Sequence, residues 1–428
     1  MSEITLDFLN SLLKDDYPDV TIYHFEGAPG SKRGDNYTSM VYRITLTGSR
    51  RFVEPNGSDV IEEHWENSII YKCLPESLQR RETFKSEELF CNEVAFYTKI
   101  WPEFYNFQNQ WPGHSSFRSI PKCYLAQNDC VVLKDLKREG FVMADRRQGL
   151  NLEQCYSVLK HLSHFHAISL AMKAQDPERF YDLLNDEESV QEVFFIEENT
   201  EYYKNYYKEA TRMAISMVEE GLSGYDNKSF YLDKMKEFCE EDRFFSTMVE
   251  LVTPQEPLAV ICHGDCWTNN FLFKYVDGDI ADMYFLDFQL ARYTSPTVDL
   301  FYIIYLCLEK ELRVEHLSSL QEYYCDELHR RVTQMTDVDS IYHNSLNKET
   351  LQDLIKEEWK RCGKIALGMS LDMLPIMTCD SDEAPNVYQH NEENTPQGSG
   401  VQPVNTTSAA CRRRMTELLV EMVDNEIL

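Results

Sequence analysis

The sequence lacks any C-x-x-C pair, although it contains 13 cysteines. Because the cysteines are odd in number and scattered, we expect neither a disulfide framework nor a zinc site, and a reducing compartment is favoured. The acidic N-terminal segment has no signal-peptide pattern. The best apolar run, from Leu300 to Leu308, is too short to span a bilayer. These absences predict a cytoplasmic protein without membrane insertion.

Positive charge is also scarce, with 42 lysines and arginines against 72 aspartates and glutamates and a net charge of −30. Proteins that bind nucleic acids or anionic membranes need basic patches, so we expect neither partner. Apolar residues make up 43% and aromatic residues 12% of the chain, which is enough for a large core. A length of 428 residues suits a protein of two lobes.

The most informative stretch runs from Leu258 to Asp299 and contains three short apolar runs that predict buried strands. These runs cover residues 258–262, 271–275 and 283–286. The first ends at His263-Gly264-Asp265, the second is preceded by Asn270, and the third delivers Asp287. Asp277-Gly278, between the second and third runs, is a hairpin-turn signal. We therefore expect Asp265, Asn270 and Asp287 to converge at the strand ends.

Three such groups suit phosphoryl transfer, which needs an aligned acceptor hydroxyl and cations beside the phosphate oxygens. The carboxylate of Asp265 can accept the hydroxyl proton. The oxygens of Asn270 and Asp287 are hard ligands of the kind that Mg²⁺ prefers. The alternative is a polar hairpin that caps a core strand, but the complete pattern with its strand context favours kinase-type chemistry.

The N-terminal third supplies features that an ATP-binding lobe would need. Residues 20–26 and 37–46 predict two strands, and the glycine-bearing loop at 27–36 between them could cover phosphates with backbone N–H groups. Lys72 ends a β-branched run at 68–71, and Glu93 lies on a predicted helix over residues 87–100. We interpret Lys72 and Glu93 as an ion pair that holds ATP. Glu88 is a rival to Glu93, and ordinary surface charges are the alternative to both roles.

An apolar strand at 130–133 is followed by a polar segment, residues 134–140, that suits a hinge between two lobes. Backbone groups from Leu133 to Leu136, including those of Asp135, are the expected contacts to adenine. The acidic balance of the chain means that an ATP site would depend on local cations and Mg²⁺.

The spacing His263-Gly264-Asp265, Asn270 and Asp287-Phe288 resembles the motifs of the aminoglycoside phosphotransferase and choline kinase branch of the kinase-like fold. The fuller string around Asp265, with Ser-Pro-x-x-Asp-Leu after it, resembles the ecdysteroid kinase-like family. That family is soluble and phosphorylates steroid-like alcohols from ATP. The resemblance covers nearly the whole chain and is weakest over residues 187–251, where the substrate would bind.

The resemblance implies an α+β, bilobal protein kinase-like fold, with a small antiparallel β-sheet N-lobe and a large, mainly helical C-lobe. Residues 1–133 would form the ATP-binding lobe and residues 134–428 the catalytic and substrate lobe. The same resemblance assigns Gly34, Asn36 and Ser39 to the phosphate loop and favours Glu93 over Glu88. His263 is included among the catalytic residues, as a group that fixes the loop by hydrogen bonds.

Two departures weigh against a protein kinase. Gln289 replaces the glycine that follows Asp-Phe in protein kinases, and no Ala-Pro-Glu motif follows. Three kinds of protein remain open: an ATP- and Mg²⁺-dependent kinase for an ecdysteroid or another hydroxylated compound, a choline- or aminoglycoside-like kinase for a polar amine alcohol, and an inactive nucleotide-binding protein. Carboxylates in the acceptor pocket would favour the second, and the intact motif residues count against the third.

Other features have a structural and a functional interpretation. Residues 187–220 and 232–251 predict two further helices, and the aromatic residues between 193 and 207 are expected to serve more as core than as a wall for a flat alcohol. The helix predicted over residues 151–173 carries His161, His164 and His166. We interpret them as packed or solvated helix residues and not as a metal site, because no carboxylate or thiolate partners lie nearby in the sequence. Asp299 could cap a helix or tie the catalytic loop. Residues 378–409, poor in large apolar side chains, are expected to form a flexible loop.

Overall fold

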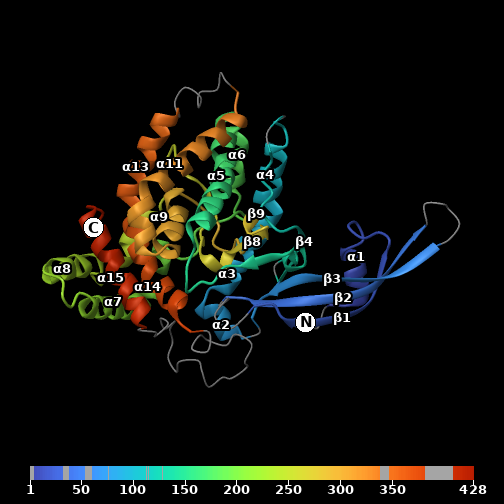
Figure 1. The fold of residues 1–428 in the computed structure, drawn as a ribbon, viewed down its shortest axis with the longest axis horizontal. Coiled ribbons are helices and arrows are strands. Elements are labelled where there is room, and N and C mark those ends of the chain that lie inside the picture. The colour runs from blue at the N-terminus through green and yellow to red at the C-terminus, as the bar shows by residue number, and fades with distance from the viewer. Residues whose placement is uncertain are drawn as a thin grey trace.

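The structure is a computed structural model and describes residues 4–31, 38–53, 60–75, 77–111, 113, 115–127, 129–337, 347–380 and 408–428. It is bilobal, with a five-stranded antiparallel sheet on one side and a mainly helical lobe on the other (Figure 1). This is the fold class expected from the sequence. Within the described ranges, no helix combines the length and the apolar composition needed to cross a membrane.

The sheet of the small lobe has the strand order β1-β2-β3-β5-β4. Its strands are β1 (Val20–Pro29), β2 (Met40–Val53), β3 (Val60–Cys73), β4 (Cys123–Gln127) and β5 (Cys130–Lys134). Ile44 and Leu46 alternate with more exposed residues on β2 and are fully buried in a small separate core. Asn10 of helix α1 (Leu6–Leu12) exchanges two hydrogen bonds with the backbone of Ile22, which fixes α1 on the sheet.

Between β3 and β4 the chain forms a helical segment that packs against the large core. It contains α2 (Leu78–Thr83), α3 (Ser86–Ala95), a π-helical turn (Phe96–Ile100) and α4 (Trp101–Gln108). Phe90, Phe96 and Phe104 are buried in the same core as the helices of the large lobe. These contacts attach the segment to the large lobe although it interrupts the sequence of the small one.

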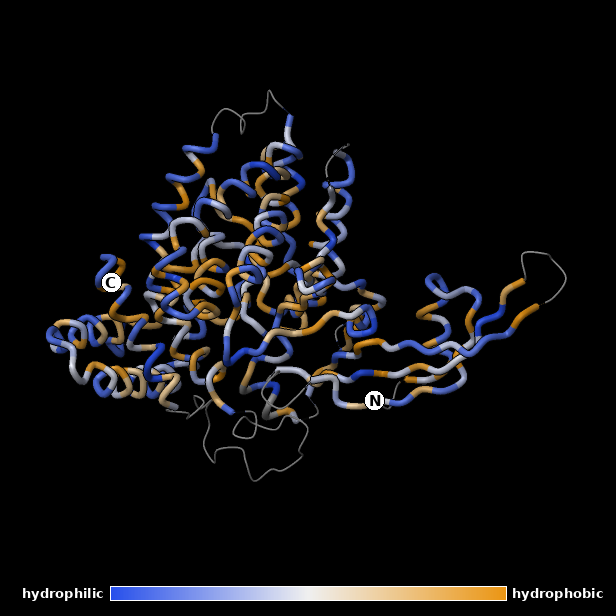
Figure 2. The backbone as a smooth tube through the Cα atoms, in the orientation of Figure 1, coloured by the Kyte–Doolittle hydropathy of each residue, from blue (hydrophilic) through white to orange (hydrophobic). Residues whose placement is uncertain are grey.

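The large lobe is built around one continuous hydrophobic core. Its helices are α5 (Leu152–Gln175), α6 (Pro177–Asn185), α7 (Thr200–Gly221), α8 (Lys228–Phe238), α9 (Phe244–Val252), α10 (Thr297–Phe301), α11 (Lys310–Gln334), α13 (Lys348–Cys362), α14 (Lys364–Thr378) and α15 (Ala409–Asp424). Asn151 and Gln154 form a reciprocal capping box that starts α5. Hydrophobic stretches run through the middle of this lobe, and α7, α8 and α15 lie together far from the sheet (Figures 1 and 2).

Two small sheets lie between the five-stranded sheet and the helices. Strands β6 (Phe141–Met143), β8 (Phe271–Val276) and β9 (Asp279–Phe285) form one of them, and β7 (Val260–Cys262) pairs with β10 (Arg292–Thr294) in the other. The predicted turn between β8 and β9 is confirmed, because Asp277 and Gly278 both have positive φ angles, 55° and 97°. Since β5 ends at Lys134 and β6 begins at Phe141, residues 135–140 connect the sheets of the two lobes.

Three predicted elements are wrong in part. Residues 187–196 are not helical, because side chains bind their backbone: Asn92 accepts from the N–H of Gln191, and Glu192 accepts from those of Phe194 and Phe195. The helix expected at 232–251 is broken at 239–243, where the exposed charged residues 240–243 add no apolar face. Gly27 belongs to β1, not to the following loop. Of the loop predicted at 378–409, residues 381–407 lie outside the described residues.

Candidate active site

Asp299, in the first turn of α10, holds the loop that follows β7. Its two carboxylate oxygens accept hydrogen bonds from the backbone N–H groups of His263 and Gly264, both at 2.8 Å. His166 of α5 contacts the same carboxylate at 3.0 Å. Gly264 has φ +82°, and an added Cβ would lie 1.9 Å from the carbonyl oxygen of Leu290. The loop therefore requires glycine, and Asp299 ties it in place.

The imidazole of His263 joins this loop to the end of the third predicted strand. Its Nε2 lies 2.9 Å from the carbonyl oxygen of Leu286, and its Nδ1 lies 3.2 Å from the N–H of Asp265. These partners require the proton on Nε2 and a lone pair on Nδ1. Burial lowers the pKa of His263, which favours this neutral form. Its contacts are those of a residue that positions the loop.

Asp265 and Asn270 are joined directly. The amide nitrogen of Asn270 donates to the backbone oxygen of Asp265 and to its Oδ2, both at 2.9 Å. The backbone carbonyl oxygen of Asn270 accepts a hydrogen bond from the N–H of Leu286, the residue before Asp287. Burial, and then the nearby charge of Asp287, raises the pKa of Asp265 to about 7. The expected convergence of the three side chains is therefore present in the structure.

Lys72 lies between two carboxylates contributed by different parts of the chain. Its Nζ is 2.6 Å from Oε2 of Glu93 and 2.6 Å from Oδ1 of Asp287. Burial alone would lower the pKa of Lys72, but the charges of Asp287 and Glu93 outweigh it and raise the pKa. The side chain of Asp287 is 20% exposed, compared with 6% for Lys72 and 1% for Glu93. Asp287 is thus the member of this cluster that faces solvent, and its φ of +66° is a strained backbone conformation.

The residues after Asp287 are fixed by contacts that sequence reasoning missed. The ring of Phe288 stacks on that of Phe96, with centroids 3.7 Å apart and an interplanar angle of 3°. Asn92 of α3 donates to the carbonyl oxygens of Gln289 and Ala291, at 2.9 and 2.8 Å. The sequence signal for Asn92 is limited to its place beside Glu93 on the predicted helix. The side chain of Gln289 accepts a hydrogen bond from Thr38, just before β2.

The connection between the lobes uses Asp135 as a structural group. Its carboxylate accepts from Nε of Arg43 at 2.6 Å and from the hydroxyl of Ser68 at 2.7 Å. Burial would raise the pKa of Asp135, but these hydrogen bonds outweigh it and lower the pKa. Leu133 and Leu136 are both buried. Backbone contacts from this segment to adenine stay a prediction.

The predicted phosphate loop is only partly visible. Gly34 and Asn36 lie outside the described residues. Ser39 is buried and directly precedes β2, whose Val41 is in register with Lys72 of β3. The end of this segment is therefore close to the lysine in the sheet.

A second polar cluster lies on the helical side of Asp265. Tyr206 and Tyr207 of α7 donate to the two carboxylate oxygens of Asp372 on α14, at 2.6 and 3.1 Å. Burial raises the pKa of Asp372 to about 6 although both hydroxyls act to lower it. The hydroxyl of Tyr302 is buried without a hydrogen-bond partner. Burial, and then the charge of Asp265, raises the pKa of Tyr302, and the charge of Asp372 acts in the same direction.

Arg292 of β10 connects the loop that follows β7 with the segment before α7 and was also missed from the sequence. Its Nη2 donates to the carbonyl oxygen of Gly264 at 2.9 Å, and its Nη1 pairs with Glu192. Glu192 also accepts from the backbone of Phe194 and Phe195. This partly buried pair therefore links the loop that follows β7 to the start of the aromatic segment, residues 193–207.

The donor set at the cleft fits a divalent cation. Asp287 and Asn270 offer carboxylate and amide oxygens, and the mutual repulsion of Asp265 and Asp287 would be relieved by a bound cation. The buried trio of His166, Cys262 and Asp299 is different. His166 bonds Tyr324 and Asp299 through its two ring nitrogens, and Cys262 donates to backbone oxygens. That trio is a hydrogen-bonded support, which agrees with the packing role expected for His166.

Comparisons with known proteins extend the same picture. The sequence profile of the ecdysteroid kinase-like family matches residues 33–337. A search of curated protein sequences finds no match.

Two solved structures are among those that match the chain. An AMP-bound complex of spectinomycin phosphotransferase is 13% identical, with a TM-score of 0.36 over 86% of this chain and 90% of that one. A GDP complex of wild-type aminoglycoside 2'-phosphotransferase-IIIa is 14% identical, with a TM-score of 0.35 over 85% of this chain and 99% of that one. The profile match carries the assignment, because it runs from the glycine-bearing loop past the end of α11 and so includes every cleft residue from Lys72 to Asp287. The chain belongs to the ecdysteroid kinase-like family.

Proposed function

We propose that the protein transfers the γ-phosphate of ATP to a hydroxyl group of a small molecule. The observation that supports this most is the gathering of Asp265, Asn270 and Asp287 beside Lys72 and Glu93. A proton acceptor, hard oxygen ligands and a cation are the groups that phosphoryl transfer requires from a protein. A location in the cytoplasm, expected from the cysteine pattern, is part of the same proposal.

In this proposal ATP lies between residues 1–133 and residues 134–428. Lys72, oriented by Glu93, holds the phosphates, and Gly34, Asn36 and Ser39 belong to the loop that covers them. Backbone groups from Leu133 through Asp135 to Leu136 contact adenine. Asn270 and Asp287 hold Mg²⁺, which supplies positive charge to the phosphate oxygens.

Asp265 is the proposed proton acceptor. A pKa raised to about 7 suits a general base that works near neutral pH. The hydrogen bond from Asn270 orients the carboxylate, and the contacts of His263 and Asp299 fix the backbone that carries it. Arg292 adds a cation beside the loop and would disfavour protonation of Asp265 before the acceptor arrives.

The acceptor is proposed to bind near the aromatic segment and Asp372. An ecdysteroid or another hydroxylated steroid or xenobiotic is the first candidate, because aromatic side chains of α7 can pack against a flat apolar body. Asp372 favours a second candidate, a polar amine alcohol, because a buried carboxylate can pair with an ammonium group. Hydroxyl groups of a steroid could donate to the same carboxylate, so the two candidates need a direct comparison.

The test is to incubate the purified protein with Mg²⁺-ATP and a panel of hydroxylated steroids and amino alcohols. Mass spectrometry of the acceptors should reveal the gain of one phosphate, and Asp265→Ala should abolish it. Asp353→Ala, which changes an exposed carboxylate on α13, is the control and should leave the gain unchanged. A phosphate gain that persists in Asp265→Ala, or none with any acceptor, would contradict the proposal.

Asp372→Asn separates the two classes of acceptor. Removal of its negative charge should raise the KM for an amino alcohol at least tenfold, because the ammonium group loses its counter-ion. The KM for a steroid should rise much less, because the amide of asparagine still offers a hydrogen-bond acceptor. Thermal unfolding of the variant checks that the bonds from Tyr206 and Tyr207 are not essential to the fold.

A further inference from the structure

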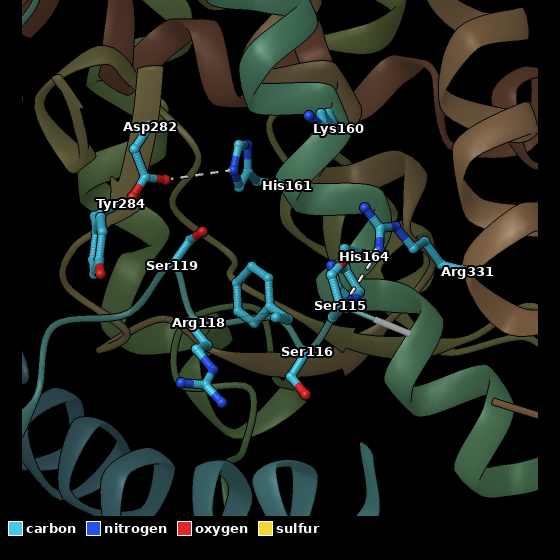
Figure 3. Close-up of a pocket in the computed structure, with 11 residues that line it drawn as sticks. Ser115, Ser116, Arg118, Ser119, Lys160, His161, His164, Asp282, Tyr284 and Arg331 are labelled. Atoms are coloured by element: carbon cyan, nitrogen blue, oxygen red, sulfur yellow. Dashed lines mark hydrogen bonds and ion pairs between the residues drawn. The ribbon is translucent and has the colours of Figure 1, made fainter. Parts of the chain in front are cut away.

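A cavity beside β9 has a volume of about 230 Å³. Four parts of the chain line it: residues 115–119, α5, β9 and α11. Figure 3 shows Lys160 and Arg331 approaching from two helices, and Asp282 and Tyr284 from the strand opposite them. None of the cleft residues Lys72, Asp265, Asn270 or Asp287 is among the described residues that line it.

The lining is rich in positive charge, although the chain as a whole has a net charge of −30. Arg118, Lys160 and Arg331 contribute permanent cations. Asp282 is the single carboxylate among the described lining residues, and it lies 3.9 Å from Nε2 of His161. The cavity is thus a local positive site in a protein of strongly negative net charge, so its charge is not a consequence of the overall composition.

Arg331 is the most buried of these three cations. It is 7% exposed, and its Nη1 donates to the backbone oxygen and hydroxyl of Ser115. Its buried Nε has no hydrogen-bond partner. The carboxylate of Glu327 lies 3.9 Å from this Nε, beyond hydrogen-bond distance, and also pairs with Arg330. A buried guanidinium with an unsatisfied donor is unfavourable unless an acceptor is supplied.

We propose that this cavity binds a small tetrahedral oxyanion, the phosphate or sulfate group of an inorganic ion or of a small monoester. A guanidinium offers a fork of donors that matches such oxygens, and the hydroxyls of Ser115 and Tyr284 add neutral donors. The volume exceeds the roughly 30 Å³ share of one water molecule and is below the roughly 300 Å³ of the smallest drug-sized pockets.

The position of the cavity suggests what an anion would influence. The N–H of Phe285 donates to the carbonyl oxygen of Ser119 at 2.9 Å, so the lining segment is bonded to β9 two residues before Asp287. An anion in the cavity would hold residues 115–119, α5 and α11 against this strand. The binding site itself does not depend on the proposed phosphoryl transfer.

The first test is calorimetric titration of the protein with sodium sulfate and with glycerol 3-phosphate, at a constant ionic strength set by sodium chloride. Saturable binding should weaken at least tenfold in the double variant Arg118→Ala/Lys160→Ala, whose two side chains are exposed and tolerate replacement. The control is Arg212→Ala/Lys356→Ala, which removes the same charge from exposed sites on α7 and α13 and should bind as the wild type does. Tighter binding of glycerol 3-phosphate would identify a monoester, and equal binding a free anion.

The second test locates the anion. Crystals soaked in sodium selenate at one concentration should show an anomalous peak beside Arg331 in the wild type and a much weaker peak there in the Arg118→Ala/Lys160→Ala variant. Absence of saturable binding, equal weakening in both double variants, or a selenate peak only beside Lys72 would overturn the proposal. The selenate peak does not depend on phosphoryl transfer. A protein without kinase activity would therefore still show the peak, whereas an empty cavity would not.

Discussion

The carboxyl group of Asp265 is buried beside a second carboxylate, and its pKa is raised from 3.8 to about 7. The folded protein therefore binds this proton more tightly than the unfolded chain does. The stability that this protonation contributes is complete below about pH 4 and is lost as the pH rises through about 7. Ionisation of Asp265 therefore lowers the free energy of unfolding, which is typical of a functional group.

Asp265→Asn replaces this carboxyl with a neutral group of the same shape. We expect the variant to gain stability relative to the wild type as the pH rises from 5 to 8.5, by on the order of 2 kcal/mol, without added Mg²⁺ or nucleotide. Urea unfolding at both pH values measures the difference. Asp353→Asn, at an exposed site, should show no such change with pH. An equal offset at both pH values would contradict the assigned environment of Asp265.

Asp299 has the opposite electrostatic setting. Burial would raise the pKa of Asp299, but its bond with His166 and the backbone N–H groups outweighs this and lowers the pKa. Asp299→Asn places an amide N–H₂ where two donors already point, so one buried N–H loses its acceptor. We expect a loss of about 2–4 kcal/mol in the free energy of unfolding, measured in urea. Asp326→Asn, whose partner Lys348 is partly exposed, is the control and should lose less than about 1 kcal/mol.

Among the elements, the short segment after β9 depends most on its neighbours. Phe288 stacks on Phe96 of the π-helical turn, and Asn92 bonds to the backbone beyond it. These contacts hold Asp287 at a φ angle that a non-glycine residue rarely adopts. The orientation of α3 and the position of Asp287 are therefore expected to change together.

Phe288→Leu tests this coupling, because it keeps a buried apolar side chain and removes the ring contact. We expect a loss of about 1–2 kcal/mol in stability, from the lost aromatic pair and the smaller volume. The KM for Mg²⁺-ATP should rise, since Asp287 is less firmly positioned. Phe230→Leu on α8, where the ring is 53% exposed, should change neither quantity. A normal KM in a destabilised Phe288→Leu would separate the stack from the site.

The elements that could be predicted are those whose own residues determine them. Apolar runs identify β7, β8 and β9, and the signals at Asp277-Gly278 and Asn151 mark a turn and a helix start. Residues 187–196 could not be predicted, because the side chain of Asn92, on the distant helix α3, binds the backbone of Gln191. The same holds for the site: the kinase spacing locates Asp265, Asn270 and Asp287, whereas Arg292 contacts the loop that follows β7 only through tertiary packing.

The whole molecule has two hydrophobic cores, and the five-stranded sheet contributes to both: Val131 and Leu133 of β5 belong to the large core and Val132 to the small one. The small lobe has its own hydrophobic cluster, and Lys72 and Thr38 reach across to Asp287 and Gln289 of the large lobe. In a chain with a net charge of −30, this junction concentrates both the cation and the carboxylates that a Mg²⁺-nucleotide would contact. We therefore expect ligand binding to stabilise the two lobes together.

Mg²⁺-ATP at roughly 100 times its dissociation constant should add about 2.7 kcal/mol to the stability of the folded protein. The midpoint of thermal unfolding should consequently rise by a few degrees. The rise should disappear with EDTA, because in the proposed site Asp287 and Asn270 would hold the nucleotide through the metal. It should also disappear in Lys72→Met, whose apolar side chain cannot contact phosphate. Lys356→Met, at an exposed position on α13, should keep the full shift. If Lys72→Met retained a wild-type shift that EDTA still removed, the nucleotide would have to bind elsewhere on the molecule, and the cleft between the lobes would lose its proposed role.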